Sequence, residues 1–116
     1  MFVKNDSRTK ELRQNLYGDN GDVIMHHVVE GELMPKGSRL VAEVSLAPGQ
    51  GIGWHVHSNE TEIYLMTAGE AVVDDNGTEY IAHAGDVVVT PNGYGHSIFN
   101  RAQSGEVKFT AIIILD

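Results

Sequence analysis

Thirteen glycines in a chain of 116 residues are the feature that most restricts how this sequence can fold. Glycine is favoured in tight turns because it adopts backbone conformations with positive φ at no steric cost. Many turns in a short chain leave room for short strands and little room for long helices. A chain of this length also has room for only one hydrophobic core. The sequence therefore predicts a single all-β domain.

Turn signals separate short apolar runs from Asp22 to the end of the chain. The clearest is Asp74-Asp75-Asn76-Gly77, whose Asn-Gly pair is typical of a β-hairpin. Strands are expected at residues 22–29, 39–46, 52–57, 62–67, 70–73, 78–82, 87–90, 96–100 and 107–115. Eight or more short strands at this spacing are typical of a sandwich or a barrel.

The polar N-terminal segment, residues 1–21, is expected to form an arm outside the domain at residues 22–116. Ser7 could cap a short helix that places Leu12 and Leu16, four residues apart, on one face. A frayed arm, or a strand exchanged with a partner subunit, fits this segment equally well. The sequence leaves these alternatives open.

Composition excludes several classes of partner. Sixteen acidic against eight basic residues give a net charge of −8, so a polyanion such as nucleic acid would be repelled. No run approaches the roughly 18 apolar residues of a membrane span, and the first residues lack the apolar core of a signal peptide. The absence of cysteine removes disulfides and thiolate ligands and fits a cytoplasmic location. We therefore expect a cytoplasmic protein that binds neither nucleic acid nor membrane.

Four residues on neighbouring predicted strands have the spacing of a metal site. His55 and His57 project from the same face of one strand, about 6.6 Å apart along the chain. Glu62 follows a four-residue turn, so antiparallel pairing is expected to bring its carboxylate beside the two imidazoles. His96 begins a later strand after a glycine-containing loop. These side chains can converge on one ion.

A bare His-x-His pair is more often two exposed strand residues than a metal site, so the wider spacing carries the argument. Two segments of the chain combine glycines with candidate ligands at defined spacings. The first contains Gly49, His55, His57, Glu62 and Gly69, and the second contains Gly85, Pro91, Gly93, His96 and Asn100.

These segments resemble the two motifs of the cupin superfamily at each defining position, over residues 49–100. The resemblance implies a double-stranded β-helix, or jelly-roll, cupin barrel that is usually dimeric. It also implies that His55, His57, Glu62 and His96 bind the metal ion. Strand edges of such a fold need cover, which the N-terminal arm or residues 111–115 could supply in a homodimer.

Other polar residues rank lower as ligands. Glu60 lies inside the predicted turn and outside the motif, so it ranks well below Glu62. His26 and His27 adjoin on one strand and therefore face opposite ways, so at most one of them faces the interior. His83 is expected at the surface.

Tyr64 is the one proton donor that strand parity places in the pocket, because Tyr64 and Met66 share the parity of Glu62. It is the candidate catalytic residue, although packing in the core explains an aromatic at this position at least as well. Glu43 and Tyr94 are further candidates that could reach the mouth of the site. Asn100 is expected to hydrogen-bond backbone at a strand end.

Three imidazole nitrogens and one carboxylate oxygen suit one divalent transition metal: Mn, Fe, Ni, Co or Zn. If six-coordinate, the ion keeps two positions that a bidentate small-molecule ligand, such as an organic acid, diol or sugar, can occupy. The resemblance implies a metal-dependent enzyme of the dioxygenase, decarboxylase or isomerase type acting on such a substrate. The alternatives are a non-catalytic ligand-binding or sensing protein and a purely structural metal.

Overall fold

The computed structural model describes residues 1–18 and 21–116. Nearly all of their regular secondary structure is strand, with three single-turn 3-10 helices. The helices span Asn5–Ser7 (η1), Leu16–Gly18 (η2) and Gly31–Leu33 (η3). The strands span Lys10–Gln14 (β1), Asp22–Val29 (β2), Ser38–Leu46 (β3), Gly51–Val56 (β4), Glu60–Ala68 (β5), Glu70–Asp75 (β6), Thr78–His83 (β7), Val87–Thr90 (β8), Gly95–Phe99 (β9) and Val107–Leu115 (β10).

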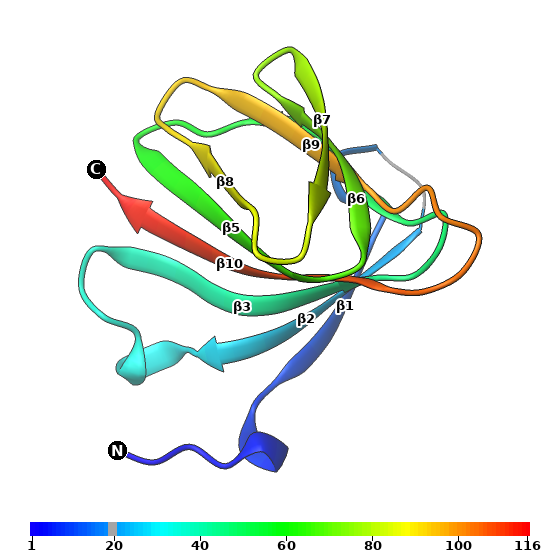
Figure 1. Cartoon of the computed structure of the whole chain (residues 1–116). Helices are drawn as coiled ribbons and strands as arrows, with labels where there is room; N and C mark the ends of the chain where they lie inside the picture. Colours follow the sequence, from blue (N-terminus) through cyan, green and yellow to red (C-terminus); the bar gives the residue numbers. More distant parts are fainter. Residues whose placement is uncertain (19–20) are drawn as a thin grey trace.

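Two antiparallel sheets face each other across the core (Figure 1). One has the strand order β1-β2-β3-β10-β5-β8, and the other has the order β4-β9-β6-β7. The expected all-β jelly-roll architecture is confirmed. Within residues 1–18 and 21–116 the two hydrogen-bonded ladders stay separate, so the expected barrel is a two-sheet sandwich that backbone hydrogen bonds do not close.

The core forms between the sheets because buried residues alternate along the central strands. On β3 and β10 the inward-facing side chains lie directly opposite each other. These pairs are Leu46 with Val107, Val44 with Phe109, Ala42 with Ala111 and Leu40 with Ile113. From the opposite sheet, Ile52, Val73 and Ile98 pack against them as buried members of the same cluster.

Among the described residues of the N-terminal segment, the helices are the single turns η1 and η2, and Leu12 lies in neither. Instead β1 pairs antiparallel with β2 of the same chain, from Lys10 opposite His26 to Gln14 opposite Asp22. Leu12 is 56% exposed, whereas the flanking residues on β1 are half-buried, which is the alternation of a strand and not of a helix. The division into an arm at residues 1–21 and a domain at residues 22–116 stays a prediction.

The expected pairing between the strand at residues 52–57 and the strand at residues 62–67 is wrong. β4 pairs with β9, whereas β5 pairs with β10 and β8 in the other sheet. The chain crosses between the sheets in the three residues 57–59, where Asn59 has a φ of 62° and its N–H donates to Asn92 Oδ1 at 2.8 Å. Asparagine tolerates this left-handed conformation, so the link can be very short.

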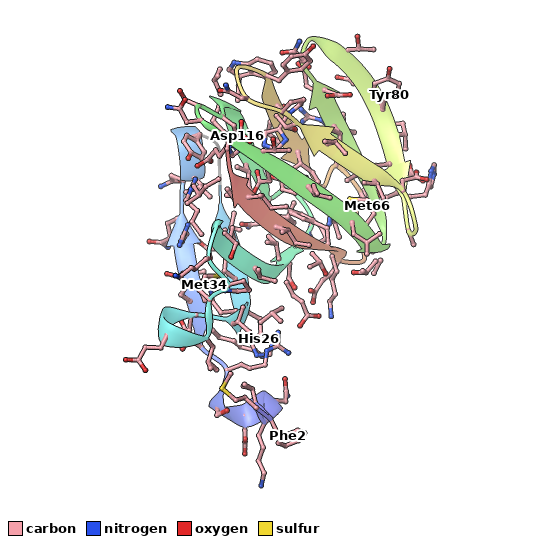
Figure 2. The ribbon with its side chains drawn as sticks, turned by 90° about the vertical axis from the view of Figure 1, so that its left-hand side faces the viewer. Phe2, His26, Met34, Met66, Tyr80 and Asp116 are labelled. Carbon is pink, nitrogen blue, oxygen red and sulfur yellow. The ribbon has the colours of Figure 1, made fainter. Side chains whose placement is uncertain are left out.

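Figure 2 shows the molecule turned by 90°, with Phe2 at the N-terminal end and Tyr80 near the opposite edge. Met66 lies on β5 and is 1% exposed, as its strand parity predicts.

Among the described residues, no helix has the length and apolar character that crossing a membrane requires.

Gly69 lies at another crossing between the sheets, from β5 to β6, and has a φ of 78°. A Cβ at this position would lie 2.3 Å from the backbone oxygen of Glu106. Gly77, in the β6–β7 hairpin, has a φ of 102°, and a Cβ added there would have no neighbouring atom within 4 Å. The two glycines therefore share a left-handed backbone but differ in the space around them.

We expect Gly69→Ala to lower the free energy of unfolding by about 3 kcal/mol or more, because backbone must move. Gly77→Ala, which bears only the conformational cost, should lower it by about 1 kcal/mol. Urea unfolding followed by circular dichroism measures both values. Equal losses would show that the contact with Glu106 does not restrict Gly69.

Candidate metal centre

The four predicted ligands come together between the two sheets. His55 and His96 lie directly opposite each other on β4 and β9, and His57 follows the end of β4. Glu62 lies on β5 of the facing sheet. Their donor atoms all lie within 4.8 Å of one another, and all four residues are buried or nearly so. The structure therefore contains a group that could hold a metal ion.

The distances between donor atoms fit a single transition-metal ion. His96 Nε2 lies 3.0 Å from His55 Nε2 and 3.1 Å from His57 Nε2. Glu62 Oε1 lies 2.9 Å from His57 Nε2, 3.0 Å from His96 Nε2 and 4.0 Å from His55 Nε2. Adjacent donors around a six-coordinate ion with bonds of about 2.1 Å are about 3.0 Å apart, against about 3.4 Å around a tetrahedral ion.

Each imidazole is anchored through the nitrogen that faces away from this centre. His55 Nδ1 lies 2.7 Å from the backbone oxygen of Gly53, and His96 Nδ1 lies 2.8 Å from Thr90 Oγ1. His57 Nδ1 lies 2.6 Å from Glu60 Oε2. With a proton on each Nδ1, each Nε2 carries a free lone pair toward the centre, which is the form a metal ion requires.

Glu60 holds His57 and is not a rival to Glu62. It is the first residue of β5 and not part of a turn, and it is buried on the same face as Glu62. Arg39 donates to it from Nε at 2.6 Å and from Nη2 at 2.7 Å. These bonds, aided by His57, lower the pKa of Glu60 against the opposing effect of burial. The sequence predicts that this strand begins at Glu62, whereas β5 begins at Glu60. With the correct start, strand parity places Glu60 on the same face as Glu62, beside the metal ligands.

The electrostatics of the group favour the charge states of metal ligands. Burial would raise the pKa of Glu62, but hydrogen bonds with the three histidines outweigh it and hold that pKa far below its usual range. Burial lowers the pKa of His96. The hydrogen bond with Glu62 raises the pKa of His57 despite burial. Glu62 is therefore ionised, and His57 takes a proton more readily than His96 does.

A cavity of about 150 Å³ opens beside His55, His57 and Glu62. Arg13 of β1 and Arg39 of β3 line it and bring positive charge. Tyr17 of η2 also lines it and stacks on the His55 ring, with centroids 4.1 Å apart and planes 10° apart. Sequence reasoning missed these three residues because no motif contains them, and β1 and η2 were not predicted.

Tyr64 lines the same cavity and is 2% exposed. Its ring stacks on His96 at 4.8 Å and packs against Phe109 at 4.4 Å. Burial, with a smaller effect of the Glu62 charge, raises the pKa of Tyr64 well above its usual value. The phenol therefore keeps its proton and can donate a hydrogen bond, and its catalytic role stays a prediction.

His27 also lines the cavity, with its Nε2 2.6 Å from Glu11 Oε1. Its neighbour His26 lies opposite Glu43 on the β2–β3 ladder, near the N-terminal end of the molecule (Figure 2). Glu43 does not reach the site, because β3 turns its even-numbered residues inward and leaves Glu43 exposed in an ion pair with Arg8. The expectation for Glu43 is therefore wrong.

The remaining candidates have structural positions. Tyr94 does not line the cavity, and its backbone oxygen accepts the His57 N–H at 3.0 Å. His83 is exposed at the end of β7, as expected. Asn100 donates from Nδ2 to the backbone oxygens of Leu46 and Gly105, both at 2.9 Å, so it bonds backbone as predicted.

We expect Glu60→Gln to lower the affinity for a divalent transition metal about 10- to 100-fold, because the neutral amide holds the Nδ1 proton of His57 less strongly than the carboxylate does. Glu79→Gln, an exposed position on β7, is the matched control. Titration with zinc(II) against a competing chelator measures both affinities. Equal affinities in the two variants would contradict the anchoring role of Glu60.

Metal affinity should also fall as the pH falls. The raised pKa of His57 means that protons compete for its Nε2 at a higher pH than for an ordinary histidine. Affinity is therefore expected to begin to fall at a pH above about 6.5, the ordinary pKa of histidine, and to keep falling as the pH is lowered to about 5.5. The same zinc titration in a pH series measures it, and a flat profile over this range would contradict the prediction.

The comparisons with known proteins agree with this geometry. The family model for the cupin domain matches residues 42–113. An oxalate-binding protein from Thermotoga maritima is 40% identical over 115 residues, which cover 99% of this chain and 94% of that protein. A crystal structure of a predicted oxalate decarboxylase from Thermotoga maritima has a TM-score of 0.91 and 40% identity, with both chains fully covered.

At lower identity, a cupin 2 conserved barrel domain protein from Salinispora arenicola shares the fold. Its TM-score is 0.73 at 22% identity, over 98% of this chain and 87% of that one. The family match covers all four candidate ligands and more than half of the chain. This chain belongs to the cupin family.

Proposed function

We propose that this protein holds one divalent transition metal ion with His55, His57, Glu62 and His96 and uses it to bind a small organic acid. A dicarboxylate of the size of oxalate is the first candidate. The observation that carries the proposal is that one cavity joins the donor group to two guanidinium groups, those of Arg13 and Arg39. A bound metal ion would supply a Lewis acid that holds the oxygens of the acid.

The size and charge of the cavity support such a ligand. A cavity of about 150 Å³ has the size of one known to hold benzene, which has six non-hydrogen atoms, as does oxalate. Two arginines line the cavity although the whole chain has a net charge of −8. Each also pairs with a carboxylate, Arg13 with Glu11 and Arg39 with Glu60, so their role in ligand binding is to donate hydrogen bonds as well as to carry charge. The name of the 40% identical relative, an oxalate-binding protein, is consistent with this ligand class.

Arg39 is placed to link the ligand to the metal group. Its Nε and Nη2 donate to Glu60, which in turn holds His57. Among the described residues Nη1 has no hydrogen-bond acceptor, so this N–H group is available to a carboxylate in the cavity. Arg13 pairs with Glu11 at 2.9 Å and adds a second positive charge.

Turnover is the second candidate. A decarboxylase would convert oxalate and one proton to formate and carbon dioxide, and it needs a proton donor at the cavity. Tyr64, which keeps its proton, and His27, which is held by Glu11, are the groups that could serve. The sole carboxylate among the described lining residues is Glu62, itself a proposed ligand, and this favours binding over general-acid catalysis. Dioxygenase and isomerase chemistry, the homodimer and the cytoplasmic location stay predictions.

We expect oxalate to bind the zinc-loaded protein and not the metal-free protein or the His57→Ala variant, because the ion holds the acid. Isothermal titration calorimetry with oxalate measures this, and elemental analysis of protein purified without a tag identifies the native metal. Oxalate binding of equal strength without metal would contradict the proposal. Formate production by the natively loaded protein, absent in His57→Ala, would establish the decarboxylase instead of the binding protein.

Arg13→Gln should weaken oxalate binding about tenfold while the zinc affinity stays unchanged, because it removes one charge from the cavity wall but no metal ligand. Lys4→Gln, an exposed position outside the cavity, is the matched control. If both variants bind oxalate as the unmodified protein does, Arg13 has no part in the site.

A further inference from the structure

Tyr17 forms the part of the cavity wall that covers a metal ligand from outside. Its ring lies parallel to the His55 imidazole at 4.1 Å, yet the residue is 57% exposed. His55 is thereby held on two sides, since its Nδ1 bonds Gly53. The Tyr17 ring therefore stands between solvent and the donor group, next to the open volume of the cavity.

The backbone at Tyr17 is strained. Its φ of 55° and ψ of 40° lie in the left-handed region, which a bulky aromatic residue rarely adopts. Asn15 has a similar φ of 52°, but asparagine tolerates that conformation. Strain of this kind persists where surrounding contacts hold it in place, and it is concentrated at ligand sites. Here the contact is the stack on His55.

We propose that the Tyr17 ring limits the length of the acid that the site accepts. This inference rests on the proposed function and deepens it. The ring lines the cavity directly beside the metal ligands and takes up space there, so we expect a two-carbon dicarboxylate to fit next to it and a four-carbon one to be hindered. Tyr17 also lies outside residues 42–113, the part that matches the family model.

The test compares oxalate, malonate and succinate binding to the zinc-loaded protein by competition calorimetry. The unmodified protein should prefer oxalate over succinate by about tenfold or more, the effect expected of added methylene groups in a closed pocket. Tyr17→Ala should reduce this ratio to about threefold or less, whereas Tyr17→Phe should leave it unchanged because the ring remains.

Two further variants keep the test decisive. Tyr17→Gly removes the ring and suits a φ of 55°, so it carries the test if Tyr17→Ala does not fold. Tyr80→Ala is the matched control, since Tyr80 is 56% exposed, lies on β7 (Figure 2) and does not line the cavity. Zinc stoichiometry and melting temperature show that each variant is folded and loaded.

The outcomes separate this inference from the proposed function. If the unmodified zinc-loaded protein binds none of the three acids, the proposed function fails and the inference fails with it. If it binds oxalate but the ratio is the same in Tyr17→Ala and Tyr17→Gly, only the inference is overturned. A loss of selectivity in Tyr17→Phe equal to that in Tyr17→Ala would also overturn it, because the hydroxyl group and not the ring would be responsible.

Discussion

The site depends on three hydrogen bonds that fix the outer nitrogens of three histidines. The acceptors differ in kind: a backbone oxygen for His55, a hydroxyl for His96 and a carboxylate for His57. Their common effect is to turn three Nε2 atoms to one point, where separations near 3.0 Å suit an ion. Without such anchors, three buried imidazoles would have rotational freedom and would have to be ordered by the ion itself.

These anchors also connect the site to the fold. The three histidines come from the β4–β9 sheet and its edge, whereas Glu62, Glu60 and Thr90 come from the facing sheet. Each pair of partners therefore spans the gap between the sheets, except the local bond of His55 to Gly53. A buried carboxylate such as Glu62 is costly unless it is paired, and here the histidines of the opposite sheet pair with it. The position of one sheet over the other is thus coupled to the geometry of the donor group.

Local signals in the sequence were enough to predict the strands from Asp22 onward. The four candidate ligands followed from two spaced motifs that resemble those of cupins, because the local argument for Glu62 assumed a strand pairing that the structure does not have. Residue parity also placed Tyr64 and Met66 inside. The prediction of strand pairing was wrong. The segment before Glu62 has the sequence of a hairpin turn, but the chain crosses to the other sheet at Asn59, which has a left-handed backbone. Which strands pair is a long-range property that turn residues do not specify. For the same reason Arg39 and Glu60 could not be linked from the sequence, although they meet in space.

The residues that would hold the metal ion and several of those that would determine which small molecule binds come from different parts of the chain. All four candidate metal ligands fall within residues 42–113, the range that matches the family model. Arg13, Tyr17, His27 and Arg39, which line the cavity, all precede it. β1 can therefore change without disturbing the donor group, because it lies at the edge of its sheet and contributes no ligand. η2 differs from β1 in this respect, because its Tyr17 stacks on the ligand His55. One metal-binding fold can in this way serve many small ligands, since residues of the wall that contacts the ligand can change while the metal ligands stay the same.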